Sequence, residues 1–309
     1  MSRIQLVRAP NPSAMTLSGT NSYLIDAGCG EALVIDPGPI IERHLEALLA
    51  AARERNLRIT AIALTHGHPD HAPAAAPLAR ATGARIYAHP TSIVPHDEAF
   101  ALDGTLRIRD LALDVVDAPG HTFDHVAFYE PAEGALFTGD VILGEGTVVI
   151  APPSGAMRPY QRTLAMLGDR FGDAGRIYGG HGPAVEDPRS KIAEYIAHRA
   201  LRERELIEAL EIAPQTIPEL VLRIYGPGRA ILWPAMARQM LAYLIALAAE
   251  GRVEAVAVDR AMTGEETAIL NPPWEAIVGI EHAALIAAEL GSMLRLDRLY
   301  RYSVKRPAG

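Results

Sequence analysis

The sequence predicts an α+β fold in which sheets and helices form layers, followed by a small domain of three helices and a β-wing. Strand-like and helix-like segments alternate as far as Pro183, and such interleaving indicates an α/β or α+β class. After Pro183, long helical patterns replace the short strands. The 309 residues fit one large domain plus a smaller one better than a single compact unit.

Short apolar runs between turn residues predict the strands of the large domain, which is expected at 1–184. These strands are expected at 23–25, 32–36, 59–64, 85–88, 105–109, 111–117, 125–130, 134–138 and 177–178. Helical spacing predicts helices at 41–56, 72–82 and 160–173. In the first helix, Leu45, Leu48, Leu49 and Ala52 share one face. That face is expected to be buried, which places His44 on the solvated side.

The C-terminal part predicts a winged-helix-like domain at 185–259. Helices are expected at 188–211, from 216 onward and at 233–250, and a strand at 252–256. Thr216-Ile217-Pro218-Glu219 opens the second helix, because Thr caps it, Pro suits the first turn and Glu completes a capping box. Residues 260–309 form an extension with an apolar helix near 276–294.

The composition of the chain excludes several classes of protein and of metal site. A net charge of −8 does not suit a polyanion ligand unless a local basic surface exists. The single cysteine, Cys29, excludes an intramolecular disulfide and thiolate-rich zinc sites. No secretory signal or membrane-spanning stretch is visible, so the expected compartment is the cytoplasm.

Four metal-binding side chains lie within six positions: His66, His68, Asp70 and His71. They directly follow the strand expected at 59–64, whose end would hold their loop in place. Zinc bound by nitrogen and oxygen prefers tetrahedral geometry, with one position left for water in catalytic sites. A lone His-x-His is weak evidence, whereas the full His-x-His-x-Asp-His string is highly specific.

Three more side chains of the same types follow later strands: His121, Asp140 and His181. Each has a glycine on at least one side, which allows the backbone to approach a site closely. The recurrence of strand, turn and ligand predicts that all seven side chains converge on one metal site.

In order and type, these motifs resemble those of the metallo-β-lactamase superfamily over residues 16–183. The resemblance implies an αβ/βα four-layer sandwich with two metal ions. By that resemblance, the first metal would be held by His66, His68 and His121, the second by Asp70, His71 and His181, and both by a bridging Asp140. The true β-lactamases of this fold lack the bridging aspartate, which disfavours a β-lactamase.

Two further segments are similar to the β-lactamase-like protein 2 family, known for a mitochondrial endoribonuclease. They are residues 139–147 and residues 195–199, the latter followed by Arg202-Glu203. That family carries a C-terminal winged-helix domain, at the place where spacing also predicts one. It does not require residues 260–309.

The resemblance also implies a mechanism. Two divalent metals would hold a bridging hydroxide that attacks a phosphodiester or an acyl carbon. Zinc is favoured, although histidine and carboxylate ligands also suit manganese or iron. Asp70 and Asp140 are the expected catalytic residues, with Asp70 orienting the nucleophile and passing a proton to the leaving group. Asp36 is expected either to support a metal-binding histidine or to form the turn before Pro37-Gly38.

Three functions remain open from the sequence. The first is an endoribonuclease on single-stranded RNA, although residues 185–252 carry nine basic and nine acidic side chains and so lack a net basic charge. The second is a small-molecule hydrolase of thioesters, esters or lactones, as in hydroxyacyl-glutathione hydrolases. The third is a non-catalytic nucleic-acid-binding protein with structural metals. The helix near 276–294 is a candidate homodimer contact, and no membrane partner is expected.

Other polar side chains have competing interpretations. His125 either reaches the metal site or packs beneath the metal loop. His198 and Arg199 either face a substrate channel or dock their helix on the rest of the protein. In each case the packing interpretation is at least as well supported by the sequence.

Overall fold

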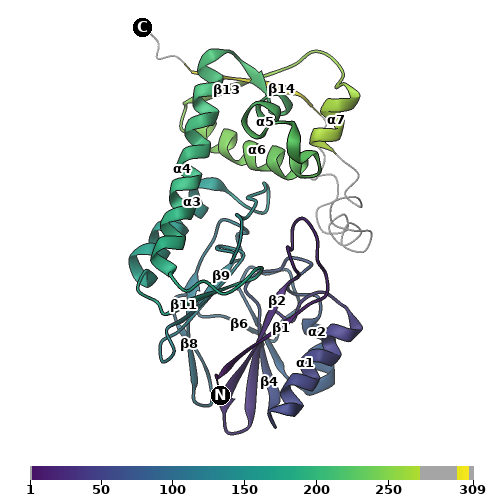
Figure 1. The fold of residues 1–309 in the computed structure, drawn as a ribbon, viewed down its shortest axis with the longest axis vertical. Coiled ribbons are helices and arrows are strands. Elements are labelled where there is room, and N and C mark those ends of the chain that lie inside the picture. Colours follow the sequence, from purple (N-terminus) through teal and green to yellow (C-terminus); the bar gives the residue numbers. More distant parts are fainter. Residues whose placement is uncertain (1, 272–297, 306–309) are drawn as a thin grey trace. The chain divides into compact units, whose positions relative to one another are not determined.

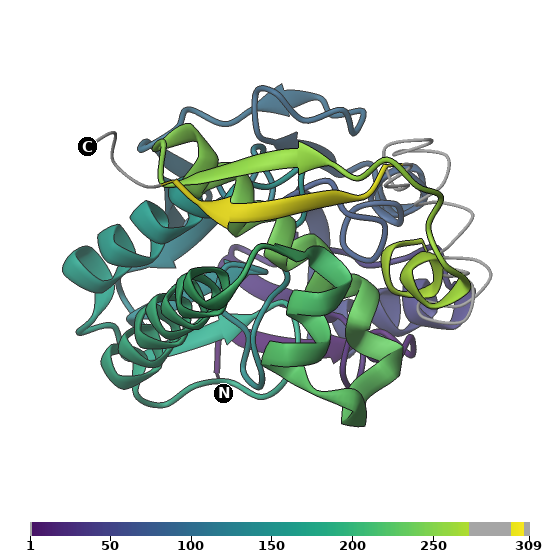
Figure 2. The same ribbon diagram turned by 90° about the horizontal axis from the view of Figure 1, so that it is seen from above.

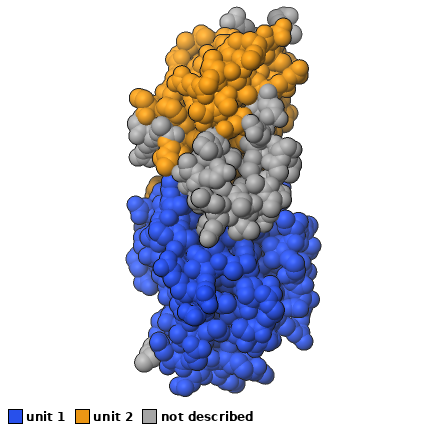
Figure 3. All heavy atoms as spheres, turned by 90° about the vertical axis from the view of Figure 1, so that its right-hand side faces the viewer, with its two compact units in different colours: residues 1–148, 163–193 blue, residues 149–162, 194–309 orange. Residues whose placement is uncertain are grey.

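The protein was analysed as a computed structural model, which describes residues 2–271 and 298–305. The chain forms two compact units (Figure 3). Unit 1 comprises residues 1–148 and 163–193, and unit 2 comprises residues 149–162 and 194–309. The division expected from sequence lay at residue 184, whereas segment 149–162 belongs with the C-terminal unit.

The first sheet of unit 1 has six strands in the order of the sequence. They are β1 (Ile4–Arg8), β2 (Asn21–Gly28), β3 (Glu31–Ile35), β4 (Arg58–Ala63), β5 (Arg85–Ala88) and β6 (Glu98–Ala99). The first three strands pair antiparallel, and β3 to β6 pair parallel. All five residues of β3 are buried, as expected for a central strand covered on both faces.

The second sheet of unit 1 has five strands in the order β11-β10-β9-β8-β7. Their bounds are β7 (Thr105–Ile108), β8 (Leu111–Asp117), β9 (Val126–Glu130), β10 (Ala135–Gly139) and β11 (Arg176–Gly179). Pairing is antiparallel except between β10 and β11, which run parallel.

Two apolar clusters hold these layers together. Side chains from both sheets, among them Leu33, Val115 and Phe137, form the core between the sheets. A second cluster, with Leu48, Ile62 and Leu78, lies between the first sheet and the helices α1 (Glu42–Glu54) and α2 (Ala75–Thr82) (Figure 1). Helix α3 (Met157–Phe171) packs on the second sheet through Phe171, whose ring lies 4.9 Å from that of Tyr129. The layers confirm the predicted α+β fold class.

Unit 2 is built around α6 (Trp233–Ala249), nearly all of whose faces are buried. Its other elements are α4 (Pro188–Ile212), which enters it from unit 1, β12 (Gln215–Thr216), α5 (Ile217–Tyr225), the 3-10 helix η1 (Pro227–Leu232), β13 (Val253–Ala257), α7 (Gly264–Leu270) and β14 (Tyr300–Val304). Helix α5 begins as expected, since Thr216 and Glu219 form a reciprocal capping box.

A strand from the C-terminal extension completes the small sheet of unit 2. The sheet has the order β12-β14-β13, and β14 pairs antiparallel with both neighbours. Figure 2 shows β14 in yellow beside β13. The winged-helix assignment stays a prediction, and the helix expected near 276–294 lies outside the described residues.

One expectation about helix α1 was wrong. His44 is 1% exposed, and its Nε2 lies 2.9 Å from the Ser22 hydroxyl. Leu48 and Ala52 of the expected face are buried, and Leu45 and Leu49 are partly buried against the same cluster, but His44 and Ala51 also belong to the buried face. The turn that brings Gly38 against the His44 ring explains the difference, because a Cβ at Gly38 would lie 3.1 Å from that ring. Within the described residues, no helix is long and apolar enough to cross a membrane.

Candidate metal centre

The first four candidate ligands lie in the loop between β4 and α2. The loop turns tightly after His68, because the backbone N–H groups of His71 and Ala72 both donate to the His68 carbonyl, at 3.0 and 3.1 Å. This turn places His66 and His68 before it and His71 after it. One short segment therefore presents imidazoles to two neighbouring positions.

The remaining three ligands come from the second sheet. His121 follows β8, Asp140 follows β10 and His181 follows β11. Close approach requires glycine beside them. A Cβ at Gly180 would lie 2.3 Å from Asp140 Oδ1 and 2.6 Å from His71 Cε1, which no larger residue can satisfy. The glycines flanking these ligands thus have a steric role.

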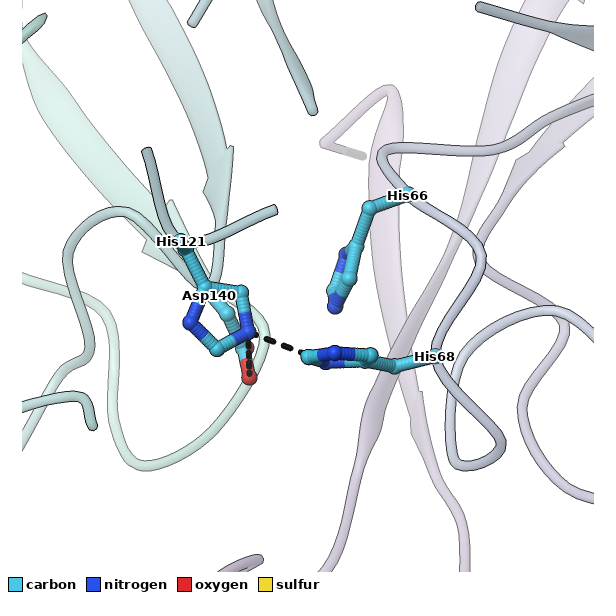
Figure 4. Close-up of side chains that lie close together, drawn as sticks. All are labelled: His66, His68, His121 and Asp140. Carbon is cyan, nitrogen blue, oxygen red and sulfur yellow. Dashed lines mark hydrogen bonds and ion pairs between the residues drawn. The ribbon is translucent and has the colours of Figure 1, made fainter. Parts of the chain in front are cut away.

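One group of ligand atoms is formed by His66, His68, His121 and Asp140, all within 4.8 Å of one another (Figure 4). His121 Nε2 lies 3.0 Å from His68 Nδ1 and 3.7 Å from Asp140 Oδ2. His66 and His68 approach from the first sheet, and His121 and Asp140 from the second.

A second group is formed by Asp70, His71 and His181. His181 Nε2 lies 3.1 Å from Asp70 Oδ2, and His71 Nε2 lies 3.5 Å from the same oxygen. Asp140 reaches this group too, with Oδ1 3.3 Å from His71 Nε2 and Oδ2 3.5 Å from His181 Nε2. The structure therefore brings all seven predicted side chains together, and the Asp140 carboxylate lies within 4 Å of histidine nitrogens in both groups.

The donor set fits bound cations. His66 Nε2, His71 Nε2 and Asp140 Oδ1 are buried without any hydrogen-bond partner. Buried polar atoms are rarely left unsatisfied, and three converging on one place call for a common partner. A positive ion that accepts nitrogen and carboxylate lone pairs satisfies all three, as zinc does in proteins.

Asp36 supports the cluster from behind. Its Oδ2 accepts from His71 Nδ1 at 2.9 Å and from the Thr65 hydroxyl at 2.6 Å, while Oδ1 accepts from the Thr65 backbone N–H at 2.7 Å. These bonds orient the His71 ring so that Nε2 faces the ligand group. The sequence left open whether Asp36 supports a histidine of the site or only forms a turn, and the bond to His71 confirms the first.

His125 packs beneath the metal loop, which is one of the two interpretations that the sequence allows. It is fully buried, and its ring stacks on that of His66 with centroids 4.7 Å apart. Its Nε2 accepts from the Asp140 backbone N–H at 3.1 Å, which holds the carboxylate in position. Burial lowers the pKa of His125 to about 3, so the ring is neutral and able to accept.

Sequence reasoning did not single out the residues that hold His181. The His181 Nδ1–H donates to the Gly19 carbonyl at 3.3 Å. Asn21 Nδ2 donates to the carbonyls of Gly179 and Gly182, both at 2.9 Å, and so fixes the loop on either side. These contacts join loops far apart in the chain, and nothing in the sequence shows which loops are joined.

The charges of the cluster balance one another. Burial would raise the pKa of Asp70 and Asp140, but the imidazoles of His71 and His181 hold both below their usual range. Burial would lower the pKa of His181, yet Asp140 and Asp70 raise it to about 10. His66, facing burial and other imidazoles, has its pKa lowered well below its ordinary value. Positive charge is therefore favoured at the second group, where protons stand in for a metal ion.

The two polar residues considered on α4 lie in unit 2. Arg199 is 2% exposed, and its guanidinium lies 5.2 Å from the Tyr160 ring centroid. The Tyr243 hydroxyl donates to the Arg199 carbonyl at 3.1 Å. These contacts join α4 to α3 and α6 within the unit, which is a packing role.

Comparisons with known proteins agree with this geometry. The profile of the "Metallo-beta-lactamase superfamily" matches residues 15–181. The chain is 31% identical to the "Beta-lactamase-like protein 2 homolog" of Drosophila melanogaster, over 79% of this chain and 87% of that protein. It is 32% identical to the "Atrochrysone carboxyl ACP thioesterase" of Aspergillus fumigatus, over 68% of this chain and 65% of that protein. A metallo-beta-lactamase family protein from Thermus thermophilus superposes with a TM-score of 0.69 at 24% identity, over 82% of this chain and 96% of that one.

Proposed function

Because the chain belongs to the metallo-β-lactamase superfamily, whose members are metal-dependent hydrolases, we propose that it hydrolyses a small acyl thioester or ester at two divalent metal ions. The hydrolase assignment rests on the family and on the histidine–aspartate cluster. The number of ions, their identity and the substrate are the proposed part.

The two groups of ligand atoms support a two-metal centre. His66, His68 and His121 would hold one ion, Asp70, His71 and His181 the other, and Asp140 would serve both. Zinc is the favoured metal, with manganese or iron as alternatives, because nitrogen and carboxylate ligands suit all three. When bound, such a pair supplies Lewis-acid activation of the scissile bond and lowers the pKa of water.

Asp70 is the residue best placed to handle a proton. Its side chain is 16% exposed, whereas that of His71 beside it is 0% exposed. The Thr20 hydroxyl donates to Asp70 Oδ2 at 3.5 Å, and Thr20 is itself fixed by two hydrogen bonds with Asn11. Asp70, which is ionised at neutral pH, would orient the attacking water, accept a proton from it and pass that proton to the leaving thiol or alcohol.

The charge of the loops around the cluster is the observation that favours an acyl substrate over a nucleic acid. The loops of unit 1 that bear or touch the ligands are 9–20, 64–74, 89–97, 118–125, 140–148 and 180–187. These described loops contain no lysine or arginine, and four of them add carboxylates besides the candidate ligands, at Asp97, Asp124, Glu145, Glu186 and Asp187. Grooves that follow a nucleic-acid backbone are lined by basic side chains. An uncharged acyl group needs no basic side chains for its binding. A relative that is 32% identical is named a thioesterase.

Cleavage of single-stranded RNA is the second candidate. It is favoured by similarity to a β-lactamase-like protein 2 homolog over 79% of the chain, which extends into unit 2. The winged helix predicted there would be the RNA-binding part. That proposal requires the basic contacts to come from outside the loops of unit 1.

Three substrates assayed side by side test the proposal. They are a hydroxyacyl thioester, bis(p-nitrophenyl) phosphate and a single-stranded RNA oligomer, with metal content measured on the same preparation. We expect about two metals per chain and turnover of the thioester. Asp140→Ala and His68→Ala should lower that turnover by more than ~100-fold, since loss of a supporting residue alone costs 10–100-fold.

The exposed Asp169 of α3 offers a matched control, and Asp169→Ala should retain full activity. RNA cleavage that both ligand variants lose, with an inert thioester, would establish the second candidate instead. A preparation without metal, whose residual turnover does not respond to either variant, would contradict the metal centre itself.

A further inference from the structure

Helix α6 buries one charged side chain. Arg238 is the only Asp, Glu, Lys or Arg in the segment Trp233–Ala249. It is 3% exposed, and burial lowers its pKa to about 10, which leaves the guanidinium protonated at neutral pH. Buried arginines are normally paired with an anion.

No such partner is present among the described residues. Arg238 Nη2 is buried without a hydrogen bond, and within residues 2–271 and 298–305 no ion pair joins Arg238 to a carboxylate. The carboxylates of unit 2 that form ion pairs do so elsewhere. Glu203 and Glu250 pair with Arg158 and Arg252, Glu205 with Arg202, Glu208 with Arg204, Glu219 with Arg301, and Glu266 with Arg260.

The next residue, Gln239, also has a buried N–H donor without an acceptor. Gln239 is 5% exposed, and its Oε1 accepts from the Ile150 backbone N–H at 3.0 Å. That bond fixes the amide, so Nε2 is held as a donor, and Nε2 is buried without an acceptor. Two neighbouring side chains thus have buried N–H groups, and both lack an acceptor.

The helix also leads from Arg238 toward the surface. Ile245 lies seven residues on, so it shares the face of Arg238 on an α-helix. It is 51% exposed, and Leu241 between them is partly buried.

We propose that Arg238, with Gln239 beside it, binds an oxyanion, the phosphate or carboxylate group of a ligand. A guanidinium presents paired N–H donors that match two oxygens of either group, and an amide N–H adds a third contact. The site lies in unit 2 and involves none of the candidate metal ligands. It is therefore independent of the proposed hydrolysis.

Inorganic phosphate and succinate serve as probes of the full-length protein, titrated by calorimetry at constant ionic strength. Binding of phosphate but not succinate would assign the site to phosphate groups, and the reverse to carboxylates. Arg238→Met removes the charge and keeps the length. We expect it to weaken binding of the preferred probe by ~10- to 100-fold, the loss of a charge-assisted hydrogen bond. Gln239→Met should weaken it less.

Arg223→Met on α5, at an exposed position, is the matched control and should bind as the wild type does. Should Arg238→Met fail to fold, Arg238→Lys replaces it and should weaken binding severalfold, because lysine lacks the planar pair of donors. Equal affinity of the wild type and the Arg238 variant would overturn the proposal. So would the absence of binding by either probe, or binding that only a chelator abolishes, which belongs to the metal ligands.

Discussion

The two units of this protein differ in where their charged side chains lie, buried in a cluster in unit 1 and mostly exposed in unit 2. In unit 1, Asp36, Asp140, His71 and His181 are each less than 9% exposed and contact one another around atoms that lack a partner. In unit 2, the ion pairs of Arg158 with Glu203 and Glu250 use side chains that are 14–37% exposed. Its central helix carries one charge. Unit 1 is organised around a polar centre, whereas unit 2 is organised around an apolar helix.

This difference has an energetic consequence. Buried charges are stable only when they are paired, and His66 Nε2, His71 Nε2 and Asp140 Oδ1 in unit 1 are buried atoms that a cation would satisfy. Its folding should therefore depend on metal binding and on pH. The ion pairs of unit 2 are partly exposed to solvent, so the loss of one should change the free energy of unfolding little.

The largest effect is expected from Asp36→Asn. The amide keeps one acceptor oxygen but sets an N–H group against the donors of Thr65 or His71. Metal affinity should fall 10–100-fold because the ring of His71 loses its orientation. The free energy of unfolding should fall by about 1–3 kcal/mol. Chelator competition and urea unfolding measure both quantities, with Asp169→Asn as control. Unchanged metal affinity would show that Asp36 only forms the turn.

A smaller effect is expected from the buried His44. Its pKa is lowered to about 4 by burial, against an ordinary value of 6.5, so the unfolded chain binds a proton that the folded chain does not. Stability contributed by this residue should be complete above pH 6.5 and fall as the pH decreases from 6.5 to 4. At pH 5 the loss should be about 2 kcal/mol.

Urea unfolding of the wild type and of His44→Gln, each at pH 7.0 and 5.0, measures this difference. The variant should lose less stability on acidification than the wild type. His96→Gln, at a partly exposed position, should behave as the wild type does. Identical pH dependence in all three proteins would rule out His44 as a source of acid sensitivity.

Metal affinity itself should depend on pH. Asp140 and Asp70 raise the pKa of His181 to about 10 in the metal-free cluster, and a metal needs the neutral ring. For each proton that the metal displaces, the metal affinity should therefore rise ~10-fold per pH unit between pH 6.5 and 7.5. Zinc competition with a chelator of known pH dependence measures the slope. His181→Ala should bind more weakly and with a shallower slope, and equal slopes would exclude His181 as a proton source.

The smallest effect is expected in unit 2. Arg158→Met removes the cation that Glu203 and Glu250 share, yet Arg252 also pairs with both. The free energy of unfolding should fall by less than about 1 kcal/mol and should depend weakly on salt. A loss above about 3 kcal/mol would mean that unit 2 relies on buried charge as unit 1 does.

The sequence by itself predicted which seven side chains meet in one cluster and the class of the fold. His66 to His71, His121, Asp140 and His181 each follow an apolar run, and the end of a strand places a loop reliably at the edge of a sheet. The alternation of strands and helices predicted the α+β layers. Both inferences rest on local periodicity and short spacing, which a single chain displays directly.

Only the tertiary structure decided which residues support those ligands. Asp36 and His71 are separated by 35 positions, and Asn21 reaches Gly182 across 161. Such contacts depend on how sheets stack, which no local pattern encodes. For the same reason His44 proved buried, and β14 joined β13 across more than 40 residues of intervening chain. Burial and strand pairing are properties of the assembled layers, whereas residue type and spacing are properties of the chain.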